Sequence, residues 1–340
     1  MRAELAVTIA AALVLALILT GAVRRFAIRH GWLDHPNQRS SHSAPTPRGG
    51  GIAIVIASLI ALSAQRLLGM VEPRLFAALL VGGLAVSTIG FMDDRRRVSA
   101  RLRLLVHAGV AVLAMALLGG LPPIQIGAQV LCFGAGGFIF GALAIIWALN
   151  LFNFMDGIDG LAAGEAAFVC AAGAVLATCF DAGAGWAAAA LAVCAASIGF
   201  LIWNWPPARI FMGDVGSGYL GYAIALFALA HGRELPAAIF PWLILGGVFL
   251  CDATATLAVR ALRRERVFDA HRSHAYQRLA RRWHSHRRVT VVVAVINVCW
   301  LLPSAIFALM HPSLALWTAV VALVPLVTLV LFTGAGRAET

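Results

Sequence analysis

The stretch that decides the fold is FGAGGFIFGALAIIWALNLF at residues 133–152, which is followed directly by NFMDGIDG at residues 153–160. The first part holds no charged side chain and is long enough for a helix to cross the ~30 Å of hydrocarbon in a bilayer. The second part places Asp156 and Asp159 three residues apart, where such a helix would leave the membrane. These residues predict a membrane-spanning helix that ends in a polar loop of candidate functional residues.

The rest of the chain has the same apolar character. Of its 340 residues, 61% are hydrophobic and 12% charged, with a mean hydropathy of +0.89, whereas an average soluble domain has roughly 25% charged residues. We therefore predict an all-α polytopic membrane protein that forms a single integral membrane domain over residues 1–340. Eleven apolar segments are expected to span the membrane: 4–23, 50–68, 75–92, 104–120, 130–152, 161–180, 185–203, 216–231, 237–259, 289–310 and 314–333.

The distribution of arginine predicts the orientation of these spans. All 26 basic residues are arginine, and 22 of them lie after odd-numbered spans or in the C-terminal tail. Because cytoplasmic loops carry an excess of positive charge, the N-terminus is predicted to lie outside and the C-terminus in the cytoplasm. This topology also explains the net charge of +11, so no nucleic-acid partner is expected.

Acidic residues also gather in the odd loops, which charge balance alone does not explain. Each acidic motif has a structural explanation by itself: neighbouring arginines can pair with it, an Asp-Gly turn can cap a helix, and a basic amphipathic segment can lie on anionic lipid. However, all these motifs are predicted to lie on the same side of the membrane, and this favours a single site built from all of them. We expect five cytoplasmic loops to assemble it, at about residues 24–49, 93–103, 153–160, 204–217 and 260–288.

Clustered carboxylates bordered by arginines suit a divalent cation bound to a diphosphate. Mg²⁺, or Mn²⁺ in its place, prefers oxygen ligands and usually shares them with substrate phosphates. Guanidinium groups bind phosphate oxygens with two parallel hydrogen bonds. Phosphoryl transfer needs mainly positioning and charge neutralisation, so a phosphorylated lipid that meets a cytosolic nucleotide at the membrane surface is the expected pair of substrates.

Four ordered motifs resemble those of one enzyme family. They are PTPRGGG at 45–51, the pair Asp93 and Asp94, NFMDGIDGL at 153–161 and NWPPARIFMGDVGS at 204–217. Together they are similar to the polyprenyl-phosphate N-acetylhexosamine-1-phosphate transferases, in which undecaprenyl phosphate attacks the β-phosphorus of a UDP-sugar and UMP is released. The resemblance implies undecaprenyl phosphate and a UDP-acetamido sugar such as UDP-GlcNAc as substrates, and it leaves a homodimer possible. It also implies that the membrane is the cytoplasmic (inner) membrane of a bacterium, with the N-terminus in the periplasm.

The resemblance also implies roles for single residues. Asp214 resembles the magnesium ligand of the family, and Asp156 is expected to share the metal. The expected catalytic carboxylates are those of Asp93, which resembles the group proposed to assist the attacking lipid phosphate, and of Asp94, Asp156 and Asp159. The expected substrate contacts are Asn153, Phe211 on the uracil ring, Arg48, Arg97, Arg272 and His274.

Two departures from the family pattern bear on the substrate. Arg97 stands where several relatives carry lysine, and His274 is the only residue kept from an H-x-H-H cluster. The sequence HAYQ at 274–277 resembles the branch that initiates O-antigen synthesis and argues against a muramoyl-pentapeptide substrate. The alternative class is a secondary transporter of an anionic solute, which would place ionisable residues near the middle of the bilayer and often has two related halves. This sequence shows neither feature clearly.

Overall fold

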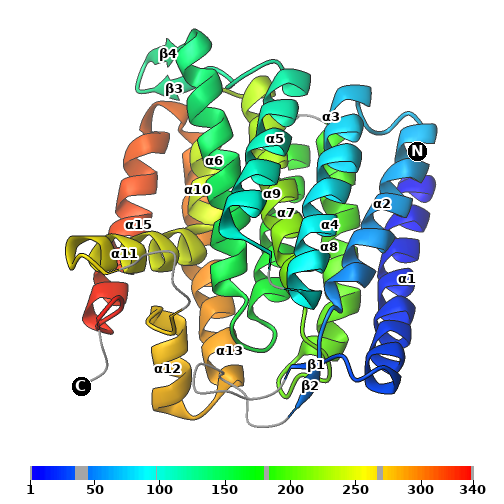
Figure 1. The fold of residues 1–340 in the computed structure, drawn as a ribbon. Helices are drawn as coiled ribbons and strands as arrows, with labels where there is room; N and C mark the ends of the chain where they lie inside the picture. The colour runs from blue at the N-terminus through cyan, green and yellow to red at the C-terminus, as the bar shows by residue number, and fades with distance from the viewer. Residues whose placement is uncertain (1, 35–44, 97, 180–183, 266–270, 338–340) are drawn as a thin grey trace.

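The computed structural model describes residues 2–34, 45–96, 98–179, 184–265 and 271–337 as a bundle of helices (Figure 1). The helices of the first half are α1 (Arg2–Arg29), α2 (Gly51–Leu67), α3 (Pro73–Ala77), α4 (Gly83–Arg95), α5 (Ala100–Leu118) and α6 (Gly134–Met155). The others are α7 (Leu161–Cys179), α8 (Ala184–Asn204), α9 (Asp214–Glu234), α10 (Ile239–Leu245), α11 (Gly247–Leu262), α12 (Ala275–Trp283), α13 (His286–Ile296), α14 (Leu302–Met310) and α15 (Ala315–Phe332).

Short elements complete the fold. The π-helical turns η1 (Ala78–Gly82) and η2 (Asn297–Leu301) join α3 to α4 and α13 to α14, and the 3-10 turn η3 (Pro312–Leu314) precedes α15. Two antiparallel hairpins pair β1 (Leu33–Asp34) with β2 (Thr46–Pro47) and β3 (Ile124–Ile126) with β4 (Gln129–Leu131). The prediction of an essentially all-α chain is therefore confirmed for the described residues.

The number of spans differs from the eleven that the sequence predicts. Among the described residues, nine helices are long and apolar enough to cross a membrane, and a tenth is obtained if one bent pair counts as a span. The second expected span corresponds to α2, whose 17 residues lie at the lower limit for crossing a bilayer. The structure thus supports a multi-pass bundle with nine or ten spans of sufficient length.

The ninth expected span, residues 237–259, is not one straight helix. It is divided into α10 and α11, whose axes differ by 78°, and Figure 1 shows α11 lying across the direction of the bundle. Gly246 and Gly247 lie at the break, where the absence of side chains leaves the backbone free to leave the helical path. The apolar composition of this segment conceals the bend.

Helix α9 lies at the centre of the bundle, and glycines let its neighbours approach it closely. A Cβ atom on Gly51 of α2 would lie 2.5 Å from the Cα atom of Gly216 in α9. A Cβ atom on Gly90 of α4 would lie 2.6 Å from the carbonyl oxygen of Asp214. Small residues allow this kind of backbone contact between membrane helices, and here they fix the position of the first turn of α9.

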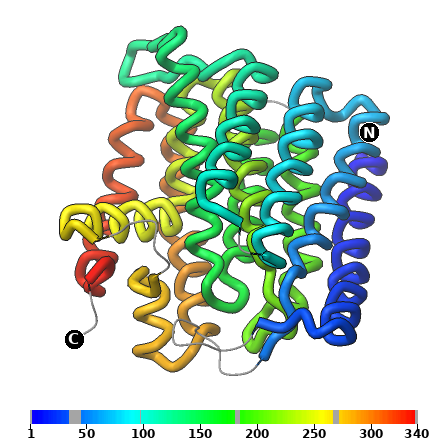
Figure 2. Tube along the Cα trace, in the orientation of Figure 1, coloured from blue at the N-terminus to red at the C-terminus, as the bar shows by residue number. Residues whose placement is uncertain are grey.

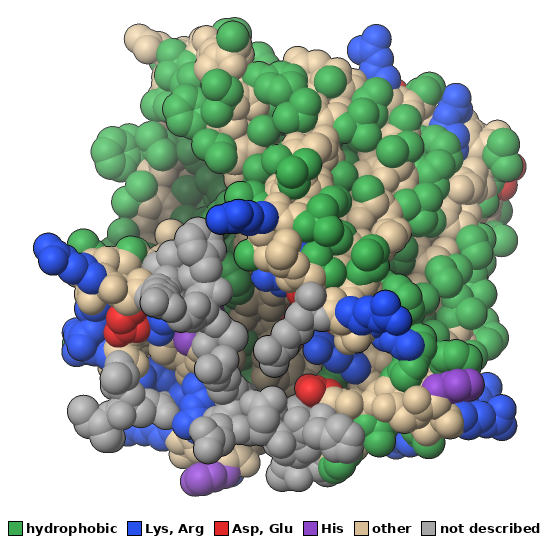
Figure 3. All heavy atoms as spheres, in the orientation of Figure 1, with side chains coloured by type: hydrophobic (Ala, Val, Ile, Leu, Met, Phe, Trp, Pro, Cys, Tyr) green, Lys and Arg blue, Asp and Glu red, His purple; other side chains and the backbone are tan. Residues whose placement is uncertain are grey.

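The polar loops of the described chain lie at one end of the bundle. Figures 1 and 2 show the β1–β2 hairpin, the connections after α6 and α8, and helix α12 at the lower end, while the β3–β4 hairpin lies at the upper end. On the face drawn in Figure 3, charged side chains gather at the lower end and hydrophobic side chains cover most of the rest. The assembly of the odd loops into one site stays a prediction, which the common position of these described loops supports. Their cytoplasmic orientation stays a prediction.

Candidate active site

The site is built around the first turn of α9, which the carboxylate of Asp94 holds from the end of α4. The backbone N–H of Asp214 donates to one oxygen of Asp94 at 3.0 Å, and the N–H of Val215 donates to the other at 3.3 Å. Gly213 has a φ of 79°, and any side chain there would collide with this carboxylate. A carboxylate is well suited to the free N–H groups and positive end of a helix dipole, so Asp94 positions Asp214.

Arg48 joins the carboxylates of Asp94 and Asp214. One of its nitrogens lies 2.8 Å from Oδ1 of Asp94 and 3.1 Å from Oδ1 of Asp214. Burial alone would lower the pKa of Arg48, but the surrounding carboxylates, chiefly Asp94 and then Asp214, raise it above its ordinary value. The guanidinium therefore stays charged and compensates two acids that are 5% and 22% exposed.

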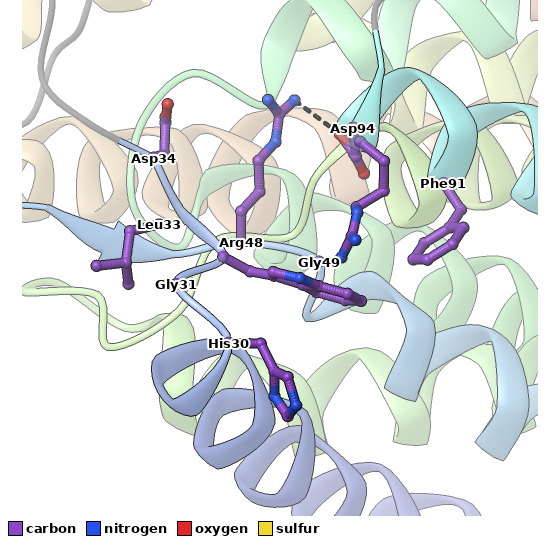
Figure 4. A pocket seen from close by; sticks show the side chains of 10 residues that line it. His30, Gly31, Leu33, Asp34, Arg48, Gly49, Phe91 and Asp94 are labelled. Atoms are coloured by element: carbon purple, nitrogen blue, oxygen red, sulfur yellow. Dashed lines mark ion pairs between the residues drawn. The ribbon is translucent and has the colours of Figure 1, made fainter.

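Arg48 also borders a pocket of about 430 Å³ (Figure 4). The pocket lies between the end of α1, the β1–β2 hairpin and the end of α4, and Trp32 forms part of its lining. The guanidinium of Arg95 lies 3.5 Å from the centre of the Trp32 ring, a cation–π contact. This hollow leaves open space beside the paired charges of Arg48 and Asp94.

Asp93 has different partners from its neighbour Asp94. Its Oδ1 accepts a hydrogen bond of 2.7 Å from the N–H of Val98, and its Oδ2 lies 2.6 Å from the guanidinium of Arg103. The same guanidinium lies 3.7 Å from Oδ2 of Asp214. Asp93 therefore holds Arg103 beside Asp214, a role that sequence reasoning did not assign to Arg103 individually.

The last turn of α6 carries Asn153, and Asp156 follows directly as the C-cap of this helix. The side-chain amide of Asn153 donates to the Oγ of Ser217 in α9 at 3.4 Å. Burial raises the pKa of Asp156 well above its ordinary value, the charges of Asp214 and Asp94 add to the rise, and Arg48 opposes it. Ionisation of Asp156 therefore has a free-energy cost in the folded protein.

This cost predicts that Asp156→Asn stabilises the substrate-free protein. The raised pKa means that ionised Asp156 disfavours the folded state at any pH above its unfolded value of about 4, and asparagine removes that charge. We expect the midpoint of thermal unfolding in detergent to rise by at least ~2 °C at pH 8, with a smaller gain at pH 5. An unchanged or lower midpoint at pH 8 would contradict the claim that ionised Asp156 destabilises the folded protein.

Asp159 faces other partners. Its Oδ2 accepts from the N–H of Ala208 at 2.9 Å, and its Oδ1 lies 3.2 Å from Nδ1 of His286 at the start of α13. Its carbonyl oxygen accepts from Thr290 at 2.9 Å. Asp159 therefore ties the 153–160 loop to α13 and to the connection before α9, whereas Asp156 lies by the charges around Asp214.

Phe211 lies next to the loop that carries Arg48. Its N–H donates to the carbonyl of Pro47 at 2.8 Å, and its own carbonyl accepts from the N–H of Gly50 at 2.9 Å. The side chain is half-buried. Two of the four sequence motifs, those at 45–51 and 204–217, are thus joined by backbone hydrogen bonds that hold Phe211 beside the segment that carries Arg48.

His274 is almost completely buried and lies at the start of α12. Its Nδ1 is 3.2 Å from Oδ1 of Asp252 in α11, and that carboxylate also accepts from the N–H groups of Ala275 and Tyr276 at 3.0 and 2.9 Å. The hydroxyl of Tyr276 donates to the carbonyl of Phe154 at 2.8 Å. Asp252 is therefore an anchor that sequence reasoning missed, although an acid within an apolar segment is a signal of function.

We expect Asp252→Ala to loosen α12 from the bundle. The change leaves two helix N–H groups and His274 without their acceptor, a loss of about 2–4 kcal/mol in the free energy of unfolding. Thermal unfolding and limited proteolysis near residue 271 measure this. Glu265→Ala is the matched control, because Glu265 pairs with Arg260 and Arg263 closer to the surface and surface pairs contribute little. Equal stability of the two variants would show that Asp252 does not anchor α12 to the bundle.

Three described residues among the expected substrate contacts are not members of the cluster: Phe211 lies beside the Arg48 loop, His274 lies on Asp252, and Arg272 is the third. Arg272 is exposed, and its carbonyl accepts from Arg281 at 2.9 Å, so it lies on the α12 side of the site. Arg97 lies outside the described residues. The described members of the cluster are therefore Asp93, Asp94, Asp156, Asp214, Asn153 and Arg48, with Arg103 added by the structure.

The donor set of the cluster fits a hard cation that is completed by substrate. Within the described parts of the chain, no group of three His, Cys, Asp or Glu side chains could hold a metal ion by itself. Magnesium, however, is typically bound through one or two carboxylates together with water and substrate phosphates. Asp214 and Asp156 supply such oxygens in a site that also holds guanidinium groups for phosphate.

The bundle and this site define a multi-pass membrane protein with a charged centre at one end, and comparison with known proteins identifies its kind. Residues 76–232 match the family model described as glycosyl transferase family 4. A Bacillus subtilis protein, described as a probable undecaprenyl-phosphate N-acetylglucosaminyl 1-phosphate transferase, is 30% identical over 88% of this chain and 83% of its own.

Two further relatives show the breadth of the similarity. A decaprenyl-phosphate N-acetylglucosaminephosphotransferase of Mycolicibacterium smegmatis is 29% identical over 85% of this chain and 79% of its own. A phospho-N-acetylmuramoyl-pentapeptide-transferase of Saccharopolyspora erythraea is 33% identical over 73% of this chain and 80% of its own. The chain therefore belongs to glycosyl transferase family 4, the polyprenyl-phosphate N-acetylhexosamine-1-phosphate transferases. These relatives do not resolve a branch of the family.

Proposed function

We propose that the protein transfers an N-acetylhexosamine-1-phosphate, GlcNAc-1-phosphate or that of a related acetamido-deoxy sugar, from a UDP-sugar to undecaprenyl phosphate, with release of UMP. The observation that carries this proposal is the cluster at the first turn of α9. There Asp94 and Asp214 meet Arg48 and Arg103 at the end of an apolar bundle. Such a site can receive a nucleotide from water and a phosphate from the bilayer.

The protein residues would act mainly by positioning and by neutralising charge. Arg48 and Arg103 are placed to bind the oxygens of a diphosphate with charge-assisted hydrogen bonds. Asp214 and Asp156 would hold Mg²⁺, which supplies Lewis-acid neutralisation of the diphosphate charge. Phe211 would pack against the uracil ring, and Asn153 would help to orient the nucleotide. Each of these assignments extends the family resemblance to the contacts described above.

The roles of the carboxylates differ in this proposal. Asp93 and Asp94 act through Arg103 and through the first turn of α9, because each already accepts hydrogen bonds from backbone N–H groups. Asp159 anchors the loop that carries Asp156. The attacking lipid phosphate is largely ionised at neutral pH, so the proposal requires no separate general base.

The sequence HAYQ at 274–277 supports a substrate other than a muramoyl pentapeptide. We propose that the product, undecaprenyl diphosphate-sugar, is the first lipid-linked intermediate of O-antigen or another cell-surface polysaccharide. The predicted orientation places the reaction at the cytoplasmic face of the inner membrane, where UDP-sugars are made. Family membership favours this transferase over the transporter alternative.

The proposal is tested with purified protein in detergent or nanodiscs that contain undecaprenyl phosphate and Mg²⁺. A panel of UDP-acetamido sugars is supplied one at a time, and the lipid product is identified by mass spectrometry. One or more sugars are expected to give undecaprenyl diphosphate-sugar in equal amount to UMP. If no sugar yields a lipid product while a solute crosses proteoliposomes, the transporter alternative is correct.

A further inference from the structure

The guanidinium of Arg48 stands where two acids from different helices face each other. A single nitrogen of Arg48 contacts both Asp94 of α4 and Asp214 of α9, at 2.8 and 3.1 Å. The other oxygen of Asp214 lies 3.7 Å from Arg103. Both carboxylate oxygens of Asp214 are therefore directed at guanidinium groups in this substrate-free arrangement. A divalent cation that approaches Asp214 meets this positive charge first.

The guanidinium is needed in the absence of substrate. Asp94 and Asp214 are partly removed from water, and two unpaired carboxylates that share such a space repel each other and lose hydration. A positive charge between them relieves both penalties. The same positive charge opposes the binding of Mg²⁺, because like charges a few ångströms apart repel strongly in a partly desolvated site.

We propose that Arg48 is a built-in counter-cation, which occupies the place between Asp94 and Asp214 until a nucleotide diphosphate enters and then moves to the phosphates, leaving Asp214 to the metal. This proposal rests on the proposed function, because it assigns the diphosphate of that substrate as the group that draws Arg48 away. According to this proposal, free Mg²⁺ and Arg48 compete for the carboxylate of Asp214, whereas Mg²⁺ and the diphosphate each strengthen the binding of the other.

The surroundings of Arg48 allow this movement without a change of fold. Its backbone is fixed, since its N–H donates to the carbonyl of Trp32 at 3.2 Å and the preceding residue pairs with Leu33 in the β1–β2 hairpin. Its side chain is 38% exposed and borders the pocket of about 430 Å³ shown in Figure 4. Rotation of the side chain is therefore sufficient.

The test measures binding of Mn²⁺ to the purified, substrate-free protein by electron paramagnetic resonance. Removal of a positive charge beside a cation site predicts that Arg48→Gln binds Mn²⁺ about tenfold more tightly than wild type. In the presence of saturating Mn²⁺, the same variant is expected to bind the UDP-sugar about tenfold more weakly, because a charge-assisted contact to phosphate is lost. If Arg48 only stabilised the fold, its replacement would weaken the binding of both Mn²⁺ and the UDP-sugar.

Two further variants complete the experiment. Arg95→Gln is the matched control, because Arg95 lines the same pocket but stacks on Trp32, and it is expected to leave the affinity for Mn²⁺ within twofold of wild type. Arg48→Lys keeps the charge and the fold, so it should retain weak Mn²⁺ binding even if Arg48→Gln unfolds. Mn²⁺ affinity that is unchanged or lower in Arg48→Gln protein that is folded, or raised tenfold in Arg48→Lys, would overturn the proposal.

The Mn²⁺ measurement requires no turnover and no sugar. If wild-type protein makes no lipid product from any UDP-sugar, the proposed function fails, while competition between Arg48 and Mn²⁺ is still measurable. If the product forms but the affinity of Arg48→Gln for Mn²⁺ is unchanged, the transferase assignment stands and the counter-cation role is wrong.

Discussion

Replacement of Asp214 by alanine is expected to abolish transfer, with kcat/KM lowered by about 10³-fold or more. The carboxylate of Asp214 faces both Arg48 and Arg103 at the centre of the cluster, and it is the residue proposed to hold the magnesium that neutralises the diphosphate. Loss of a metal contribution of several kcal/mol corresponds to a rate change of this size. UMP release from a UDP-sugar, in membranes that contain undecaprenyl phosphate, measures it.

Glu72→Ala provides the control for this variant, because Glu72 precedes α3, at the end of α2 away from the site. The control should keep its activity, and the Asp214→Ala protein should keep its thermal stability, since no described backbone N–H donates to the Asp214 carboxylate and Arg48 and Arg103 keep Asp94 and Asp93 as partners. Retention of more than a tenth of wild-type activity in Asp214→Ala would remove Asp214 from the centre of the mechanism.

Replacement of Asp94 by alanine is expected to damage stability and activity together. The change leaves the N–H groups of Asp214 and Val215 without an acceptor and removes one of the two partners of Arg48. Each unsatisfied buried group costs about 1–3 kcal/mol, and the lost ion pair adds less, because Arg48 is 38% exposed and keeps Asp214 as a partner. We expect a clear fall in the midpoint of thermal unfolding and a loss of activity of about 10²-fold or more.

The Asp94→Asn variant distinguishes the role of Asp94 as a hydrogen-bond acceptor for α9 from the effect of its negative charge alone. Asparagine has the same shape but only one oxygen, so its NH₂ group must face a backbone N–H that now points at an oxygen of Asp94. We therefore expect asparagine to lower the unfolding midpoint nearly as much as alanine does. If Asp94→Asn keeps wild-type stability but loses activity, Asp94 acts on the substrate directly, and its role as the anchor of α9 is wrong.

The architecture was largely predictable because the apolar segments are long and the charged residues separate to one end. The exceptions have local causes. The break between α10 and α11 occurs at Gly246 and Gly247. This glycine pair is a weak sign of a bend, whereas the uniformly apolar composition of the segment predicts one straight span. The bounds of α2 fall one residue short at each end of the expected segment, which brings that helix to the limit of a spanning length.

The residues of the candidate site could be predicted from the sequence, but the separate role of each residue could not. Sequence motifs bring Asp93, Asp94 and Asp214 to one face through the parity of their loops. That Asp94 accepts from the first turn of α9 depends on a contact between residues 120 positions apart. The same holds for Asp252, whose partners at the start of α12 lie 23 and 24 positions later in the chain.

The most direct test of the central claim follows the β-phosphorus of the donor. Purified protein is given UDP-GlcNAc labelled with ³²P at the β-position, together with undecaprenyl phosphate and Mg²⁺. The account predicts that the label enters the lipid as part of a diphosphate bridge and that the released UMP is unlabelled. Label that leaves as UDP, with the sugar alone on the lipid, would contradict a sugar-1-phosphate transferase.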